Sequence, residues 1–187
     1  MPPVSADNPL YFITAVTHKR LPVFRQEIMK QILALAFDEA RRSGVFKIFA
    51  YVIMTEHYHL ITNSGLKASD VVRYLNGISA RRVIGYLKEK QFESSLNQLR
   101  KTQTGKKDYR YSLWEHHSNT FLITTESMLL KKVNYIHLNP VEDGLVQDAN
   151  QYAFSSVRFW NRRQLLDNEP LDPDIKDLIW KTGGGAS

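Results

Sequence analysis

Two histidines separated by a single residue are the first feature of this sequence that could support chemistry. His57 and His59 lie in the segment HYHLIT, residues 57–62, whose aromatic and β-branched residues predict a strand. Residues i and i+2 of a strand face the same side, so both imidazoles could reach one metal ion. A strand with histidines at the surface or at the core edge would show the same pattern, and Mg²⁺ or Mn²⁺ would also need oxygen ligands. Glu56 is a further candidate ligand only if the preceding turn rotates it, because alternation places it on the opposite face.

A tyrosine and an asparagine four residues apart form the second such feature, in the segment KKVNYIHLNPVEDGLV, residues 131–146. On a helix, Tyr135 and Asn139 would share one face, whereas His137 would project about 200° away from Tyr135. A free tyrosine is a poor nucleophile because its pKa is about 10, but a nearby divalent ion can polarise a target phosphate and stabilise the leaving oxygen. The alternatives are that Tyr135 is a packed aromatic residue and that Asn139-Pro140 is simply a helix stop.

The composition and charge narrow the range of functions. With 43% hydrophobic and 24% charged residues, the 187-residue chain has the composition of a folded globular protein, and the absence of cysteine excludes disulfides, thiolate zinc sites and cysteine nucleophiles. A net charge of +6 favours a polyanionic partner such as nucleic acid, although a basic protein without such a partner would have the same charge. No apolar run approaches the ~20 residues of a membrane span, and the N-terminal MPPVSADNP predicts no secretory signal, so we expect a cytoplasmic protein.

The hydrophobic patterns predict the elements that would position these residues. They occur in the order β-α-β-β-α-β-α, with strands over 10–17, 45–54, 57–62 and 119–124 and helices over 24–43, 68–90 and 126–138. The first six elements match the ferredoxin-like βαββαβ arrangement with an antiparallel sheet, an α+β fold, and the last helix bears the tyrosine. The apolar spacing predicts that the first helix buries a face made of Ile28, Ile32, Leu35 and Ala36. We also expect Gly44 and Pro140 to end their helices. Residues 91–110 are polar and basic, which predicts a flexible segment.

Basic residues cluster in two regions that could contact DNA phosphates. The first region is the predicted helix 68–90 and the second is the flexible segment after it; the residues are Arg73, Arg81, Arg82 and Lys88, then Lys101, Lys106, Lys107 and Arg110. A solvated basic face would explain each residue equally well.

Taken together, these segments resemble the single-tyrosine transposases with a His-hydrophobic-His (HUH) motif, and in particular their REP-associated branch. EHYHLI after AYVIM is similar to the HUH motif, YIHLNPVEDGLV is similar to the tyrosine-bearing helix, and SLWEHHSNTFLIT and YAFSS fall where that branch has similar segments. The similarity covers roughly residues 10–160, most of the chain, and YIHLNPV is its more specific part. Two positions depart from the family: Thr55-Glu56 replaces the usual Pro-Asn, and Glu115 follows Leu113-Trp114 where arginine or lysine is common.

The resemblance implies a metal-dependent DNA strand transferase in which Tyr135 is the nucleophile and His57, His59 and Asn139 hold Mg²⁺ or Mn²⁺. Such enzymes cut single-stranded DNA beside a hairpin, form a 5′-phosphotyrosine link and free a 3′-hydroxyl. The transposase-like domain would span residues 1–165, followed by a C-terminal extension and flexible tail over 166–187. The wider family works as dimers that exchange tyrosine helices, while the REP-associated branch includes monomers, so a monomer and a homodimer are both expected alternatives.

Two other functions are left open by the residues themselves. A domesticated nucleic-acid-binding protein on the same fold would explain the positive charge but not the co-occurrence of the histidines, Tyr135 and Asn139. A small metal-dependent hydrolase would use water and would cleave DNA without a covalent tyrosine adduct.

Overall fold

The computed structural model describes residues 4–63, 65–101, 111–163, 165–167 and 169–178, and its centre is a four-stranded sheet. The strands are β1 (Leu10–Val16), β2 (Ile48–Ile53), β3 (His57–Asn63) and β4 (Asn119–Ile123). Their order is β2-β3-β1-β4, and every neighbouring pair is antiparallel. Nearly continuous apolar runs explain why β1, β2 and the interior of β3 are mostly buried. The predicted α+β, ferredoxin-like arrangement is confirmed.

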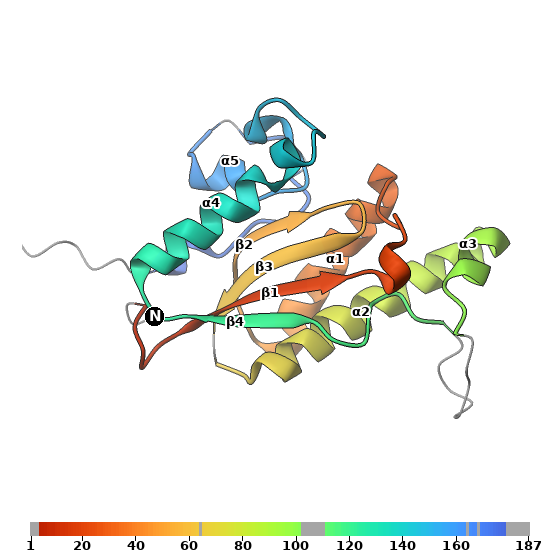
Figure 1. Ribbon diagram of the computed structural model, residues 1–187, viewed down its shortest axis with the longest axis horizontal. Helices are drawn as coiled ribbons and strands as arrows, with labels where there is room; N and C mark the ends of the chain where they lie inside the picture. The colour runs from red at the N-terminus through yellow and green to blue at the C-terminus, as the bar shows by residue number, and fades with distance from the viewer. Residues whose placement is uncertain (1–3, 64, 102–110, 164, 168, 179–187) are drawn as a thin grey trace, which may run out of the picture.

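Helices pack on both faces of this sheet. α1 (Glu27–Gly44) and α2 (Ala68–Glu89) cover one face, and α4 (Glu126–Glu142) lies on the other (Figure 1). Neighbouring residues of β3 show the two sides: the Tyr58 ring packs against Phe37 of α1, whereas the His59 ring packs against Tyr135 of α4. The alternation of a strand therefore separates the apolar helical layer from the layer that holds the histidines.

Shorter elements complete the described chain. They are α3 (Glu93–Gln98), α5 (Val157–Trp160) and 3-10 helices at His18–Arg20, Ala149–Gln151 and Ile175–Asp177. α3 corrects the expectation of a wholly flexible segment after α2, because Leu96 is buried and fixes this turn of helix against the core. Residues 102–110, the rest of that segment, lie outside the described residues.

The predicted core face of α1 is partly wrong. Ile28 and Leu35 are 45% and 58% exposed, and Ile32 is only partly buried, while Ala36 is buried as predicted. The stripe that packs on the sheet consists of Met29, Leu33, Ala36, Phe37 and Ala40. This stripe also has helical spacing, so periodicity alone could not choose between it and the neighbouring stripe one residue away.

Of the two predicted helix stops, the one at Pro140 needs correction, whereas α1 ends at Gly44 as predicted. α4 continues through Pro140 to Glu142, because the buried Ile136, Asn139 and Pro140 pack this turn against the sheet despite the missing proline N–H. Gly44 is the last residue of α1, and Val45 adopts the left-handed conformation, with φ of 53°. Gly44 is needed there because a Cβ would lie 2.8 Å from the ring of Phe46 and from that of Tyr74.

The described part of the C-terminal segment packs along β2. Arg158 donates to both carboxylate oxygens of Glu169, and the Asp174 carboxylate accepts the N–H of Ile48. Leu171 of this segment is buried, and its carbonyl oxygen accepts the hydroxyl of Tyr51 in β2. None of the described helices has the length and apolar character needed to cross a membrane.

Candidate functional site

The register of the sheet brings His57 and His59 onto the face that α4 covers. His59 lies opposite Thr14 of β1, and His57 lies opposite Val16. The two imidazole centroids are 4.8 Å apart, as expected for side chains at i and i+2 of one strand. The sequence prediction that both histidines share one face is therefore correct geometrically.

Thr14 orients His59. The Thr14 hydroxyl oxygen is 2.7 Å from His59 Nδ1, and the ring of Phe12 stacks on the imidazole with centroids 5.3 Å apart. His59 is 5% exposed, and this burial, reinforced by electrostatic interaction with His57 and Lys132, lowers its pKa to about 3. The imidazole is consequently neutral at physiological pH, which is the form that ligates metals.

α4 brings the tyrosine and the asparagine to these histidines. The Tyr135 ring lies against His59 with centroids 5.2 Å apart, and His57 Nε2 donates to Asn139 Oδ1 over 3.2 Å. Asn139 Nδ2 in turn donates to the Tyr135 carbonyl oxygen, a 3.4 Å bond along the helix face that the i and i+4 spacing predicted. Tyr135 is 43% exposed whereas Asn139 is 5% exposed, so the phenol can meet a large substrate while the amide stays behind it.

His137 holds the opposite side of α4. As the helical spacing predicted, it points away from Tyr135: it is buried, and its Nε2 lies 3.0 Å from the hydroxyl oxygen of Ser156. Ser156 also accepts the N–H of Tyr51 in β2 over 3.0 Å. Burial lowers the pKa of His137 to about 4, so it serves as a neutral anchor of the helix rather than a charged group.

The site contains buried nitrogen atoms without partners. Among the described residues, neither His57 Nδ1 nor His59 Nε2 has a hydrogen-bond partner. Unpaired buried polar atoms are costly in a folded protein, and a metal ion bound at His59 Nε2 would satisfy that atom. Within the same residues there is no cluster of three or more His, Cys, Asp or Glu side chains, so a metal site here would combine the two imidazoles with the Asn139 amide. Glu56 does not join them, because its carboxylate forms an ion pair with Arg20.

The predicted basic residues of α2 are not brought to this site. Arg81 and Arg82 both pair with Glu39 of α1, and Arg73 pairs with Asp70 one turn earlier. Lys88 lies over the ring of Tyr111. α2 packs on the opposite face of the sheet from α4, so these cations are separated from the histidines by the sheet itself. Their role in DNA binding stays a prediction, as does that of Lys106, Lys107 and Arg110, which lie outside the described residues.

Three neighbours of the site were not singled out by the sequence analysis. Thr14 and Phe121 are placed by strand register, which the sequence does not reveal, whereas Lys132 could have been noticed because it precedes Tyr135 by three residues on one helix. The ammonium of Lys132 lies 5.6 Å from the centroid of the Tyr135 ring.

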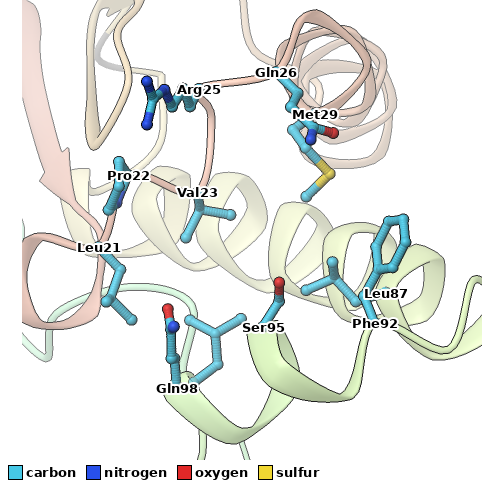
Figure 2. A pocket seen from close by; sticks show the side chains of 11 residues that line it. Leu21, Pro22, Val23, Arg25, Gln26, Met29, Leu87, Phe92, Ser95 and Gln98 are labelled. Carbon is cyan, nitrogen blue, oxygen red and sulfur yellow. The ribbon is translucent and has the colours of Figure 1, made fainter.

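A separate cavity of about 310 Å³ lies where the segment after β1 meets the end of α2 and α3 (Figure 2). It has apolar walls with several polar groups at its rim, and among its lining residues are Leu21, Met29, Leu87, Arg25, Gln26 and Gln98. None of His57, His59, Tyr135 and Asn139 is among the residues that line this cavity.

Comparisons with known proteins show what this chain is similar to. Residues 6–137 match the family described as "Transposase IS200 like". A relative from Haemophilus influenzae, described as a REP-associated tyrosine transposase, is 25% identical over 172 residues, which are 89% of this chain and 90% of that protein. A solved REP-associated tyrosine transposase bound to a REP hairpin has the same fold, with a TM-score of 0.54 and 19% identity over 95% of this chain and 93% of the other. A transposase structure from Deinococcus radiodurans overlaps less closely, with a TM-score of 0.46 and 20% identity over 69% of this chain and 88% of the other. Since the family match covers well over half of its length, the protein belongs to the IS200-like transposases.

Proposed function

We propose that this protein cleaves and rejoins hairpin-containing single-stranded DNA through a covalent 5′-phosphotyrosine at Tyr135. The observation that supports this most directly is the contact of the exposed Tyr135 ring with the buried imidazole of His59, which stands beside His57 on a strand more than 70 residues distant in sequence. The hairpin substrate is supported by the solved relative, which is bound to a REP hairpin. Transposition of DNA follows from the family, and the chemistry at Tyr135 is our proposal for how this chain performs it.

The proposed reaction is an exchange of one phosphodiester for another. The Tyr135 oxygen attacks phosphorus, a P–O bond to Tyr135 forms, and the bond from phosphorus to the 3′ oxygen breaks. The phenol proton is lost to solvent and the departing 3′ oxygen gains a proton, so no oxidant or nucleotide cofactor is needed. Because the phosphodiester energy is retained in the protein–DNA link, attack by a 3′-hydroxyl reverses the step.

We propose His57, His59 and Asn139 as the residues that hold Mg²⁺ or Mn²⁺. His59 Nε2 is unpartnered and buried, and donation from His59 Nδ1 to Thr14 would leave a lone pair on Nε2. Asn139 Oδ1 and His57 Nε2 are 3.2 Å apart, so both could face one ion if the His57 proton moved from Nε2 to Nδ1. When bound, the ion would polarise the target phosphate and stabilise the leaving oxygen.

The site residues of this proposal all come from one chain. His57 and His59 from β3 contact Asn139 and Tyr135 from α4 without a second copy. This supports cleavage by a monomer, with a homodimer as the alternative. Measurement of molar mass by light scattering alongside cleavage activity distinguishes the two.

The test uses a pool of single-stranded DNA hairpins with randomised flanks, incubated with Mn²⁺ and then denatured in detergent. We expect a protein–DNA adduct that survives denaturation, and sequencing of the captured DNA identifies the cleavage site. Tyr135→Phe should abolish the adduct while DNA binding and the melting temperature are retained, because only the hydroxyl is removed. An adduct in Tyr135→Phe would refute the nucleophile, cleavage without any adduct would indicate a hydrolase, and binding without cleavage would indicate a non-catalytic protein.

A further inference from the structure

Lys132 is held over three aromatic rings beside the site. Its ammonium lies 4.5 Å from the ring centroid of Phe12, 5.2 Å from that of Phe121 and 5.6 Å from that of Tyr135. The rings come from β1, β4 and α4, so three elements converge on one cation. Contacts with three ring faces restrict the long lysine side chain and fix the position of its charge.

The charge of Lys132 is not neutralised within the described structure. Every salt bridge found among the described residues involves other groups, and the neighbours of Lys132 at three and four residues along α4 are Leu129, Tyr135, Met128 and Ile136, none of which is acidic. Lys132 is also half-buried, which makes an uncompensated charge there more costly than on an open surface. An anionic group of the substrate would compensate it.

Phe121 offers an aromatic surface next to this charge. It lies directly opposite Phe12 in the register of β1 and β4, and it is 46% exposed whereas Phe12 is 7% exposed. β4 is at the edge of the sheet, so no further strand of the described residues pairs with its outer side. Exposed aromatic rings of this kind bind unpaired bases by stacking, with little dependence on which base is present.

We propose that Phe121 and Lys132 bind one nucleotide of the single-stranded substrate, adjoining the bond that Tyr135 attacks. The base stacks on Phe121, and the phosphate of that nucleotide contacts the Lys132 ammonium. The inference rests on the proposed function, because it assigns the substrate position from the distance between Lys132 and the Tyr135 ring. It adds a substrate-positioning site formed by β4 and the first half of α4, outside the set of histidines, Asn139 and Tyr135.

The phosphate contact is tested by neutralising substrate phosphates one at a time. In the best hairpin from the pool, each phosphate near the cleavage site is replaced by an uncharged methylphosphonate, leaving the cleaved bond intact. One replacement should slow adduct formation about tenfold in the wild-type protein, the loss expected for a hydrogen bond to a charged group. The same replacement should change the rate less than about twofold in Lys132→Met, because the contact is already absent.

Lys131→Met is the matched control for this measurement. It removes the same charge from the adjacent, exposed position of α4 but leaves the lysine over the rings in place. Lys131→Met should keep the wild-type sensitivity to the methylphosphonate. Equal sensitivity in wild type, Lys132→Met and Lys131→Met at every position would overturn the assignment of Lys132.

The stacking contact is tested with 2-aminopurine placed in the nucleotides beside the cleavage site. Its fluorescence should be quenched at one position on binding to the wild-type protein, and this quenching should be lost in Phe121→Leu, with about tenfold weaker binding. Leu122→Ala, at an exposed neighbouring residue on the other face of β4, is the control and should retain the quenching. Quenching that survives in Phe121→Leu contradicts the stacking contact.

The binding forms of both experiments use Tyr135→Phe protein, fluorescence anisotropy and a hairpin selected from the pool by binding alone, with every flanking position substituted in turn, so they need no cleavage. Loss of methylphosphonate sensitivity in Lys132→Met within this background supports the nucleotide site even if no adduct forms in the wild type. Adduct formation with unchanged sensitivity in the Lys132 variant supports the proposed function and rejects the nucleotide site. The two ideas therefore fail separately.

Discussion

Ser156→Ala tests how α4 is held so that Tyr135 meets the histidines. The Ser156 hydroxyl accepts the Tyr51 N–H over 3.0 Å and lies 3.0 Å from His137 Nε2, and Ser156 is 0% exposed. Removal of the hydroxyl leaves two buried polar groups without a partner, each costing about 1–2 kcal/mol, so the free energy of unfolding should fall by about 2–4 kcal/mol. In this variant the backbone N–H of residue 156 still donates to the Tyr51 carbonyl oxygen, which limits the loss of stability.

Urea denaturation measures this loss, and hydrogen exchange shows where it falls. The urea midpoint should decrease with little change in the slope, and amide exchange in α4 should accelerate more than in α2, because the lost contact joins α4 to β2. Ser94→Ala, at an exposed residue of α3, is the control and should change stability by less than about 0.5 kcal/mol. A loss below about 0.5 kcal/mol in Ser156→Ala, or equal acceleration in both helices, would show that Ser156 is not the anchor of α4.

Three further predictions concern the metal ligands and the C-terminal segment. His57→Ala should remove Mn²⁺-dependent adduct formation while leaving hairpin binding within about twofold, and unchanged metal dependence would exclude His57 from the site. Thr14→Val should raise the Mn²⁺ concentration needed for half-maximal adduct formation about tenfold, because His59 loses the hydroxyl that fixes its ring; an unchanged Mn²⁺ titration would count against that role. Burial raises the pKa of Glu169, but hydrogen bonds from Arg158 and from the Leu166 N–H outweigh this effect and hold the pKa below its ordinary value of 4.5. The stability contributed by the Arg158–Glu169 pair is therefore present above pH 4.5 and is lost as the pH falls below it. Glu169→Gln should therefore lower the free energy of unfolding at pH 7 by about 3 kcal/mol, measured by urea denaturation followed by circular dichroism. The stability of this variant should also decrease less than that of the wild type as the pH falls below 4.5.

The parts of the site that could be predicted from sequence are those set by local geometry. The spacing of His57 and His59 determines a shared strand face, and that of Tyr135 and Asn139 determines a shared helix face, whatever the rest of the fold does. The contact between the two pairs is not local. It depends on β3 pairing between β1 and β2 and on α4 packing across the same face, and it was expected only from the resemblance to a known family.

The errors arose where tertiary packing chose between local alternatives. α1 has apolar residues on two adjacent stripes, and the sheet buries the one with Phe37 while Leu35 is left in solvent. Pro140 has no backbone N–H to donate, which predicts the end of the helix, yet the buried contacts of this turn continue α4 for two more residues. Thr14 and Phe121 were missed because only the register of β1 with β3 and β4 places them at the site.

The division of α4 into an anchored side and an exposed side fits the task proposed for it. A tyrosine that attacks DNA must be reachable by a bulky, charged strand, so its ring cannot be buried, but an exposed ring alone would not keep a fixed distance to the histidines. Here the fixed position comes from two buried residues of the same helix: Asn139, one turn after Tyr135 on the same face and bonded to His57, and His137, on another face and in contact with Ser156 beside β2. Tyr135 itself can then be 43% exposed and still contact His59. A variant that loosens either anchor should therefore lower the rate of adduct formation more than the affinity for the hairpin, since the DNA-facing surface is left unchanged.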